Sequence, residues 1–271
     1  MDKVESILLE ALDAGGRVLK RYAEGVDSSD VHYKDEINLV TIADLESERA
    51  ILDIIRRAFP DHGVLTEEAG EVALGVRAGK PSWVIDPLDG TTNFAHGFPM
   101  YCVSIAYMDE GMPLVVGVYD PVRDELFKAR RGGGATRNGK SICVSATDSL
   151  SQALLATGFP YDIKTARENN LDYFATFAMQ AQAIRRAGSA ALDLCYIACG
   201  RFDGFWELKL HPWDTAAGWL IIEEAGGCVT DFSGGEFDIF KQECAASNGT
   251  RLHGEIMGVI RAARRLRAGV T

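Results

Sequence analysis

The sequence has 271 residues, of which 47% are hydrophobic and 9% aromatic, which is enough apolar material for one large domain or two smaller ones. Lysine and arginine number 28 against 39 aspartates and glutamates, a formal net charge of −11. This charge argues against broad electrostatic binding to nucleic acid or to an anionic membrane, and no apolar run is long enough to span a membrane.

The first residues and the cysteines bear on the compartment. Met1-Asp-Lys-Val-Glu-Ser6 lacks the basic and apolar pattern of a signal peptide, so we expect a cytoplasmic protein. The six cysteines are scattered through mostly apolar segments. Cys195 and Cys199 could share a helix face, but no second pair of cysteines or histidines completes a zinc pattern. We therefore expect buried free thiols.

The first 60 residues predict two amphipathic helices. Apolar residues recur at helical spacing over residues 3–23, and residues 25–40 then form a polar, irregular segment. Lys34 in this segment is either a solvated surface charge or a lysine that approaches a bound phosphate. A second helical pattern follows Thr41-Ile-Ala-Asp44 and ends before Pro60. Thr41 followed by an acid three residues later is similar to a capping box, so on these residues alone capping is the favoured role.

Two carboxylates occur in the stretch that runs from Trp83 to Phe94. Residues 83–85 predict a short buried strand that ends at Asp86-Pro87, because proline lacks the N–H that would continue the ladder. Residues 88–90 predict a turn, after which residues 91–93 can begin a helix. Two carboxylates flanking a tight turn could bind hard cations, and N–H groups after the glycine could face an anion. The spacing also fits an ordinary surface turn.

The remaining segments predict antiparallel sheet followed by α/β structure. Leu65-Thr-Glu-Glu68 is a short segment that ends in adjacent acids, and the dipeptide Asn138-Gly139 predicts a hairpin. Before residue 150 we expect strands at 101–108, 114–119 and 125–129. After residue 150 we expect strands at 154–157, 184–186, 202–208, 228–231 and 244–247. The helices between and after these strands are expected at 164–181, 189–199, 215–225 and 251–267.

A third candidate carboxylate, Asp214, lies in Trp213-Asp-Thr-Ala-Ala-Gly218 at the start of a predicted helix, where aspartate is also a good N-cap. This motif and Trp83-Val-Ile-Asp-Pro-Leu-Asp-Gly-Thr-Thr-Asn93 together resemble the inositol monophosphatase family of magnesium-dependent, lithium-sensitive phosphatases. Three further segments match in the family's order and at similar spacing: Thr41-Ile-Ala-Asp44, Thr66-Glu-Glu68 and Glu224-Ala-Gly-Gly227. The resemblance covers nearly the whole chain.

The resemblance implies a five-layered αβαβα sandwich that combines α+β and α/β parts and generally forms a homodimer. We expect residues 1–148 to form the α+β half, with an antiparallel sheet and most of the metal ligands. Residues 149–271 would form the α/β half, which supplies Asp214 and the substrate-binding loops. The two halves would pack closely, with the active site between them.

The resemblance also implies roles for individual residues. The metal ligands would be Glu67, Asp86, Asp89, Asp214 and the Leu88 carbonyl group, which hold two to three Mg²⁺ ions. Asp44, Glu67 and Thr91 would be catalytic. The substrate-binding set would comprise Glu67, Leu88, Asp89, Gly90, Thr91, Gly188, Ser189, Ala190, Glu207 and Asp214. Arg186 is either a substrate ligand or an arginine at the surface or dimer contact.

The implied reaction is hydrolysis of myo-inositol 1-phosphate, or of a related small polyol or sugar phosphate, by metal-activated water, with Li⁺ as inhibitor. Fructose 1,6-bisphosphatase activity, alone or combined with the first, is an alternative because relatives share the metal ligands. A regulatory protein-binding role in transcription or ribosomal RNA maturation is an alternative of another class. We expect no membrane partner and no direct binding of nucleic acid.

Overall fold

The computed structural model of the protein describes residues 1–23, 31–33, 39–67 and 79–267, without the side chains of residues 31–33, 39–41, 266 and 267. Lys34 and Glu68, two residues considered in the sequence, lie outside the described residues. Within them, no helix combines the length and the apolar character that crossing a membrane requires.

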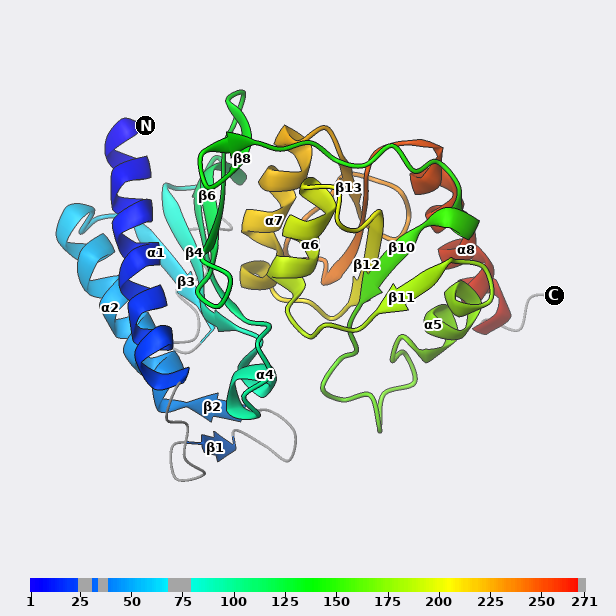
Figure 1. Cartoon of the computed structure of the whole chain (residues 1–271), viewed down its shortest axis with the longest axis horizontal. Coiled ribbons are helices and arrows are strands. Elements are labelled where there is room, and N and C mark those ends of the chain that lie inside the picture. Colours follow the sequence, from blue (N-terminus) through cyan, green and yellow to red (C-terminus); the bar gives the residue numbers. More distant parts are fainter. Residues whose placement is uncertain (24–30, 34–38, 68–78, 268–271) are drawn as a thin grey trace.

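The chain folds into five layers, which alternate between helices and sheets (Figure 1). Helices α1 (Asp2–Ala23) and α2 (Ile42–Ala58) cover one face of a seven-stranded sheet. Helices α6 (Ala190–Ala198) and α7 (Pro212–Glu224) lie between this sheet and a five-stranded one. Helices α5 (Leu171–Ala178) and α8 (Arg251–Arg267) form the last layer. The predicted αβαβα sandwich is confirmed.

The seven-stranded sheet belongs to the N-terminal part of the chain. Its strands follow one another in sequence order: β3 (Gly63–Thr66), β4 (Ser82–Asp89), β5 (Cys102–Asp109), β6 (Met112–Asp120), β7 (Glu125–Arg130), β8 (Gly134–Arg137) and β9 (Lys140–Ser141). All neighbours are antiparallel except β3 and β4, which are parallel. Asn138 and Gly139, with φ of 49° and 74°, connect β8 to β9 and confirm the predicted hairpin.

The five-stranded sheet belongs to the C-terminal part. Its order is β11 (Ala183–Arg185), β10 (Leu154–Thr157), β12 (Gly204–Leu208), β14 (Glu243–Ser247) and β13 (Cys228–Thr230). Strand β10 is parallel to both of its neighbours, and the other pairs are antiparallel. The smaller elements are β1 (Val31–Tyr33), which pairs with β2 (Leu39–Thr41), the short helix α4 (Thr91–Ala95) and the 3-10 turn η2 (Leu150–Gln152).

One predicted helix is shorter in the structure. The sequence predicted a helix over residues 164–181, but α5 begins only at Leu171. The residue before it, Asn170, has φ of 73°, a left-handed conformation that interrupts a helix. Its buried side-chain amide donates to the Thr157 hydroxyl (2.8 Å), and its carbonyl accepts from the Trp206 indole (2.7 Å). These hydrogen bonds hold the chain before α5 against strands β10 and β12, so that the helix does not extend toward residue 164.

Buried apolar residues fill the spaces between the layers. The amphipathic pattern of α1 buries Leu8, Leu12 and Leu19 against the sheet. Helices α6 and α7 are buried on most sides because each packs against both sheets. Their position fixes the two helix starts relative to the end of β4. The division into halves at residue 148 stays a prediction, because these helices belong to the packing of both sheets.

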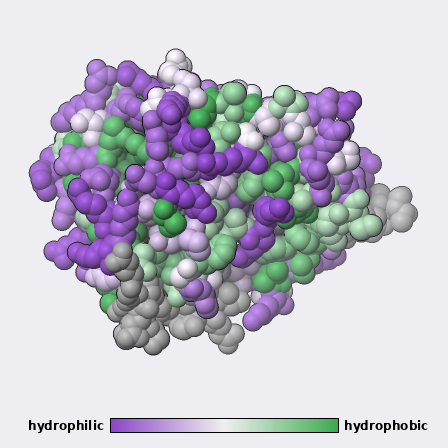
Figure 2. Space-filling model, viewed as in Figure 1, coloured by the Kyte–Doolittle hydropathy of each residue, from purple (hydrophilic) through white to green (hydrophobic). Residues whose placement is uncertain are grey.

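The surface contrasts with this interior. In the view of Figure 2 hydrophilic residues cover much of the N-terminal side, and apolar residues are scattered between them over the other half. All six cysteines are free, as expected, and three of them are buried. Cys143 is exposed, which corrects the expectation that all six would be buried.

Candidate metal centre

Strand β4 delivers two aspartates to one face of the sheet. The strand continues through Pro87 to Asp89, so the prediction that it ends at Asp86 was wrong. Asp86 pairs with Ser104 and Asp89 with Cys102, which leaves one more residue on β4 than on β5 between the two pairs. Successive side chains of a strand alternate between faces, so residues three apart would normally point in opposite directions. The extra residue at this bulge brings both carboxylates to the same side and accommodates the missing N–H of proline.

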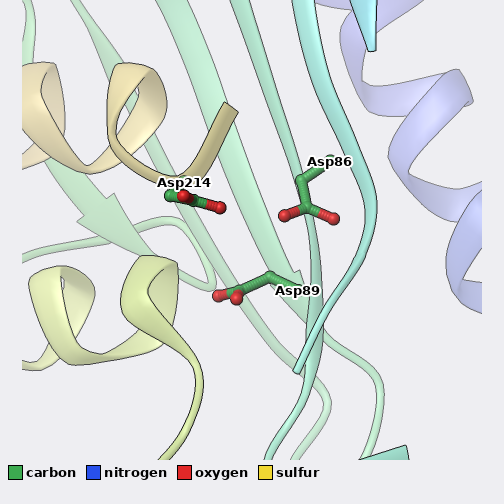
Figure 3. A group of neighbouring side chains, drawn as sticks. All are labelled: Asp86, Asp89 and Asp214. Atoms are coloured by element: carbon green, nitrogen blue, oxygen red, sulfur yellow. The ribbon is translucent and has the colours of Figure 1, made fainter. Parts of the chain in front are cut away.

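The third aspartate comes from the start of helix α7. Asp214 lies in the first turn, and its Oδ2 accepts a hydrogen bond from the backbone N–H of His211 at 2.6 Å. The side chains of Asp86, Asp89 and Asp214 point toward one another from the strand and the helix (Figure 3). Each offers one oxygen, and these oxygens lie within 4.8 Å of one another. Asp214 therefore caps its helix and also faces the two strand aspartates.

Burial makes this cluster electrostatically unusual. Burial raises the pKa of the Asp86 carboxyl well above its usual range, and the nearby carboxylates of Glu67, Asp89 and Asp214 raise it further. The pKa of Asp214 is also raised well above its usual range, by burial and then by Asp89. Buried like charges are costly unless a cation neutralises them. An all-oxygen ligand set suits a hard divalent ion such as Mg²⁺, so these residues fit the metal that the sequence predicted.

Asp89 is held in place from the other half of the chain. Its Oδ2 accepts from the Ser189 hydroxyl at 2.6 Å and from the backbone N–H of Ala191 at 2.8 Å. The Cys102 thiol lies 3.7 Å from the same oxygen. These donors lower the pKa of Asp89, although burial raises it by more. The residues at the start of α6 thus hold one oxygen of the Asp89 carboxylate through hydrogen bonds.

Behind the cluster lies a hydroxyl and carboxylate pair. The Thr91 hydroxyl oxygen is 3.1 Å from Oδ1 of Asp44 and 3.1 Å from the Leu88 carbonyl oxygen, so it donates to one of the two. The residue before Thr91 must be glycine: Gly90 has φ of 95°, and a Cβ there would lie 2.8 Å from the Met100 carbonyl oxygen. From the residues around Asp44 alone, helix capping was its favoured role. Its contact with Thr91 also connects Asp44 to the candidate site.

A cavity of about 290 Å³ opens beside the three aspartates. Its lining contains eleven of the residues predicted for the site: Glu67, Asp86, Leu88, Asp89, Gly90, Thr91, Gly188, Ser189, Ala190, Glu207 and Asp214. Asp44 is fully buried and is not part of the lining. Arg186, whose role the sequence left open, also lines the cavity. The structure therefore brings together residues from β4, α4, α6, β12 and α7.

The cavity lining also contains acids outside the aspartate cluster. Burial raises the pKa of Glu207 to about 8, although the Arg186 guanidinium acts in the opposite direction. A Cβ at Gly158 would clash with Oε1 of Glu207, so a larger residue there would displace this carboxylate from its present position. Asp193 also lines the cavity and was missed by the sequence analysis. The available signal was a single acid within the apolar residues of α6.

Known proteins share this fold and these motifs. The model of the "Inositol monophosphatase family" matches residues 1–265. A Synechocystis protein named inositol-1-monophosphatase is 47% identical over 219 residues, 81% of this chain and 75% of its own length. A Pseudomonas aeruginosa protein named Nus factor SuhB is 43% identical over 250 residues, 92% of each chain. The solved inositol monophosphatase from Anabaena superposes with a TM-score of 0.86 at 42% identity, covering 96% of each chain.

Proposed function

Because the chain belongs to the inositol monophosphatase family, we propose that it is a magnesium-dependent phosphatase of a small polyol phosphate, with myo-inositol 1-phosphate as the first candidate. The observation that carries this proposal is the cluster of Asp86 and Asp89, which are buried, and Asp214, which is partly buried, beside a cavity. Such a cluster would hold metal at one end of the cavity and leave the rest for the alcohol.

We propose that Glu67, Asp86, Asp89, Asp214 and the Leu88 carbonyl group hold two to three Mg²⁺ ions. When bound, these ions would lower the pKa of a coordinated water molecule and neutralise charge on the transferring phosphoryl group. The backbone N–H groups of Gly90 and Thr91 would bind the phosphate. The proposal needs no cysteine, serine or histidine nucleophile, because water attacks phosphorus directly.

Thr91 and Asp44 would orient the attacking water and take its proton. The Thr91 hydroxyl can donate its hydrogen to Asp44, which leaves a lone pair of Thr91 to accept a hydrogen bond from water. Asp44 is fully buried, so its carboxylate is shielded from competing solvent. The proton of the water would pass through the hydroxyl group to this carboxylate.

The lining outside the aspartate cluster supports a neutral polyol as the alcohol. Two buried acids, Glu207 and Asp193, belong to this lining together with one guanidinium, that of Arg186. The second cation of the lining, Lys209, is 2.5 Å from the Asp162 carboxylate. A second phosphate would meet these acids, so we place fructose 1,6-bisphosphate after inositol 1-phosphate.

A panel of phosphate esters tests the proposal. Phosphate release would be measured with Mg²⁺ for inositol 1-phosphate, fructose 1,6-bisphosphate, histidinol phosphate, NADP and adenosine 3′,5′-bisphosphate. We expect the highest kcat/KM for inositol 1-phosphate, and inhibition by LiCl but not by NaCl at the same ionic strength. Failure on every ester at saturating Mg²⁺ would exclude a small-molecule phosphatase.

A regulatory role is the second candidate, favoured by the 43% identity to a protein named Nus factor SuhB. The net charge of −11 disfavours direct binding of RNA but is compatible with protein contacts. Cells that carry Asp89→Asn in place of the wild type distinguish the two roles. Unchanged growth with an inactive variant would favour the protein-binding role, and loss of a phosphatase-dependent phenotype would favour the enzyme. We also propose a homodimer, which light scattering on the purified protein would test.

A further inference from the structure

We infer that Asp193 is a further substrate-binding residue, whose carboxyl group accepts a hydrogen bond from a hydroxyl group of the leaving alcohol. This inference rests on the proposed phosphatase function and defines its substrate class more closely: the alcohol must carry a hydroxyl group besides the phosphorylated one, placed to reach helix α6.

The first observation is an unsatisfied acceptor. The Asp193 side chain is 1% exposed, lines the cavity, and its Oδ1 is buried without a hydrogen-bond partner among the described residues. Buried carboxylate oxygens are nearly always hydrogen-bonded, because an unpaired acceptor loses its contacts with water and gains nothing in return. The other residues of α6 from Ala191 to Ala198 are buried and almost all apolar. An apolar residue would therefore suit the packing of this helix better than an acid does.

The second observation is the position of Asp193 relative to the metal ligands. Ser189 caps α6 and donates to Asp89 at 2.6 Å. Residues four apart share a helix face and are separated by slightly more than one turn, ~6 Å along the axis. Asp193 therefore lies on the same face as Ser189, one turn further from the aspartate cluster. A distance of this order suits the width of a small polyol ring whose phosphate is held at the cluster.

The third observation is the chemistry around the carboxyl group. Burial raises the pKa of the Asp193 carboxyl well above its usual range, the charges of Glu207 and Asp89 raise it further, and the Arg186 guanidinium acts in the opposite direction. Glu207 and Arg186 line the same cavity, and Glu207 is 9% exposed. Two carboxyl groups facing one space form a receptor for hydroxyl hydrogens. An alcohol that lacks a hydroxyl group at this point would leave the Asp193 acceptor unsatisfied in the complex as well.

The test compares two substrates that differ in their alcohol. Inositol 1-phosphate offers ring hydroxyl groups, whereas p-nitrophenyl phosphate offers none. Asp193→Ala should lower kcat/KM for inositol 1-phosphate by about 10- to 100-fold and change that for p-nitrophenyl phosphate by less than about threefold. Asp53→Asn, an exposed acid on α2, is the control and should change neither. Equal losses on both substrates, or no loss on either, would overturn the role of Asp193.

A second pair of measurements covers the case in which Asp193→Ala does not fold. Asp193→Leu keeps the approximate size of the side chain and removes both acceptor oxygens, and should reduce the preference for inositol 1-phosphate over p-nitrophenyl phosphate. With the wild type, monodeoxy inositol 1-phosphates should include one that loses about 10-fold or more in kcat/KM, and the variant should lose much less on that analogue. An unchanged preference in the variant, or the same loss on that analogue, would contradict the inference. A wild type inactive on both substrates would instead contradict the proposed function.

Discussion

The hydroxyl oxygen of Thr91 lies 3.1 Å from Oδ1 of Asp44, a fully buried carboxylate that comes from helix α2, 47 residues earlier in the chain. Thr91 begins helix α4 directly after the strand that carries Asp86 and Asp89. The contact therefore places a buried carboxylate next to the hydroxyl group of a residue that lines the cavity.

Asp44→Asn removes the proposed proton acceptor and keeps the shape of the side chain. We expect kcat to fall by about 10²- to 10⁴-fold, the range of general-base effects, with KM changed by less than about threefold. Steady-state phosphate release from inositol 1-phosphate measures both. The exposed control Asp53→Asn should behave as the wild type. A kcat for Asp44→Asn within about threefold of the wild type would remove this residue from the mechanism.

Asp86→Asn separates catalysis from stability. The change removes a buried charge that three neighbouring acids repel, so we expect the metal-free protein to become more stable while turnover is nearly abolished. Thermal melting in EDTA and phosphate release in Mg²⁺ measure the two effects. Mg²⁺ should raise the melting temperature of the wild type more than that of the variant. Retained turnover in the variant would refute the ligand role of Asp86.

Above about pH 7 the stability of the metal-free protein should fall as pH rises. Burial and neighbouring acids raise the pKa values of Asp86 and Asp214 well above their unfolded value of about 4, and burial raises that of Glu207 to about 8. The folded chain therefore binds these protons more tightly than the unfolded chain. The corresponding stability is complete below about pH 4 and is lost as pH rises through the raised values.

Melting curves between pH 7 and pH 9 test this dependence, because burial lowers the pKa values of His62, His211 and His253, and these groups act in the opposite direction only below about pH 7. In EDTA the melting temperature should fall as pH rises, and the increase produced by Mg²⁺ should grow, because the metal binds the deprotonated acids. Hydrogen bonds lower the pKa values of Asp231 and Glu125. The stability that these two groups contribute is lost only below about pH 4, outside this window. A melting temperature in EDTA that rises from pH 7 to pH 9 would contradict the assignment of the cluster.

Asn170→Ala should destabilise the protein by about 2–4 kcal/mol, because it leaves several buried polar groups without partners. The Asn170 amide donates to the Thr157 hydroxyl at 2.8 Å and to the Gly158 carbonyl at 2.5 Å, and its oxygen accepts from Trp206 at 2.7 Å. Urea unfolding measures the change. Gln180→Ala, which removes an exposed amide, should cost less than about 0.5 kcal/mol. Similar values for both variants would show that the buried network contributes little.

Local patterns predicted most of the elements, and the exceptions have physical causes. Helical spacing predicted residues 3–23, and α1 runs from Asp2 to Ala23. The end of the strand at Pro87 was predicted wrongly, because a bulge in the β4–β5 pairing accommodates a proline that local rules treat as a stop. The helix over 164–181 was too long, since the bonds of Asn170 to two distant strands override its local propensity.

The site was harder to predict from sequence patterns than the fold. Asp86 and Asp89 are close in sequence, so their proximity could be inferred from spacing, but Asp214 and Glu207 reach the cavity only through the packing of the two sheets. Their assignment depended on the resemblance to a family, not on periodicity. Asp193 had only the weak signal of a lone acid in an apolar helix, and its unpaired oxygen is visible only in three dimensions.

The most direct test of the central claim is a magnesium titration of phosphate release from inositol 1-phosphate by the wild type, Asp214→Asn and the control Asp53→Asn. The claim is that aspartates from two distant motifs hold the catalytic metal together. We expect no release in EDTA, saturable release by the wild type and the control, and a loss of about 10²-fold or more in Asp214→Asn that added Mg²⁺ does not fully restore. Release that persists in EDTA, or an Asp214→Asn variant with the magnesium dependence and rate of the wild type, would contradict it.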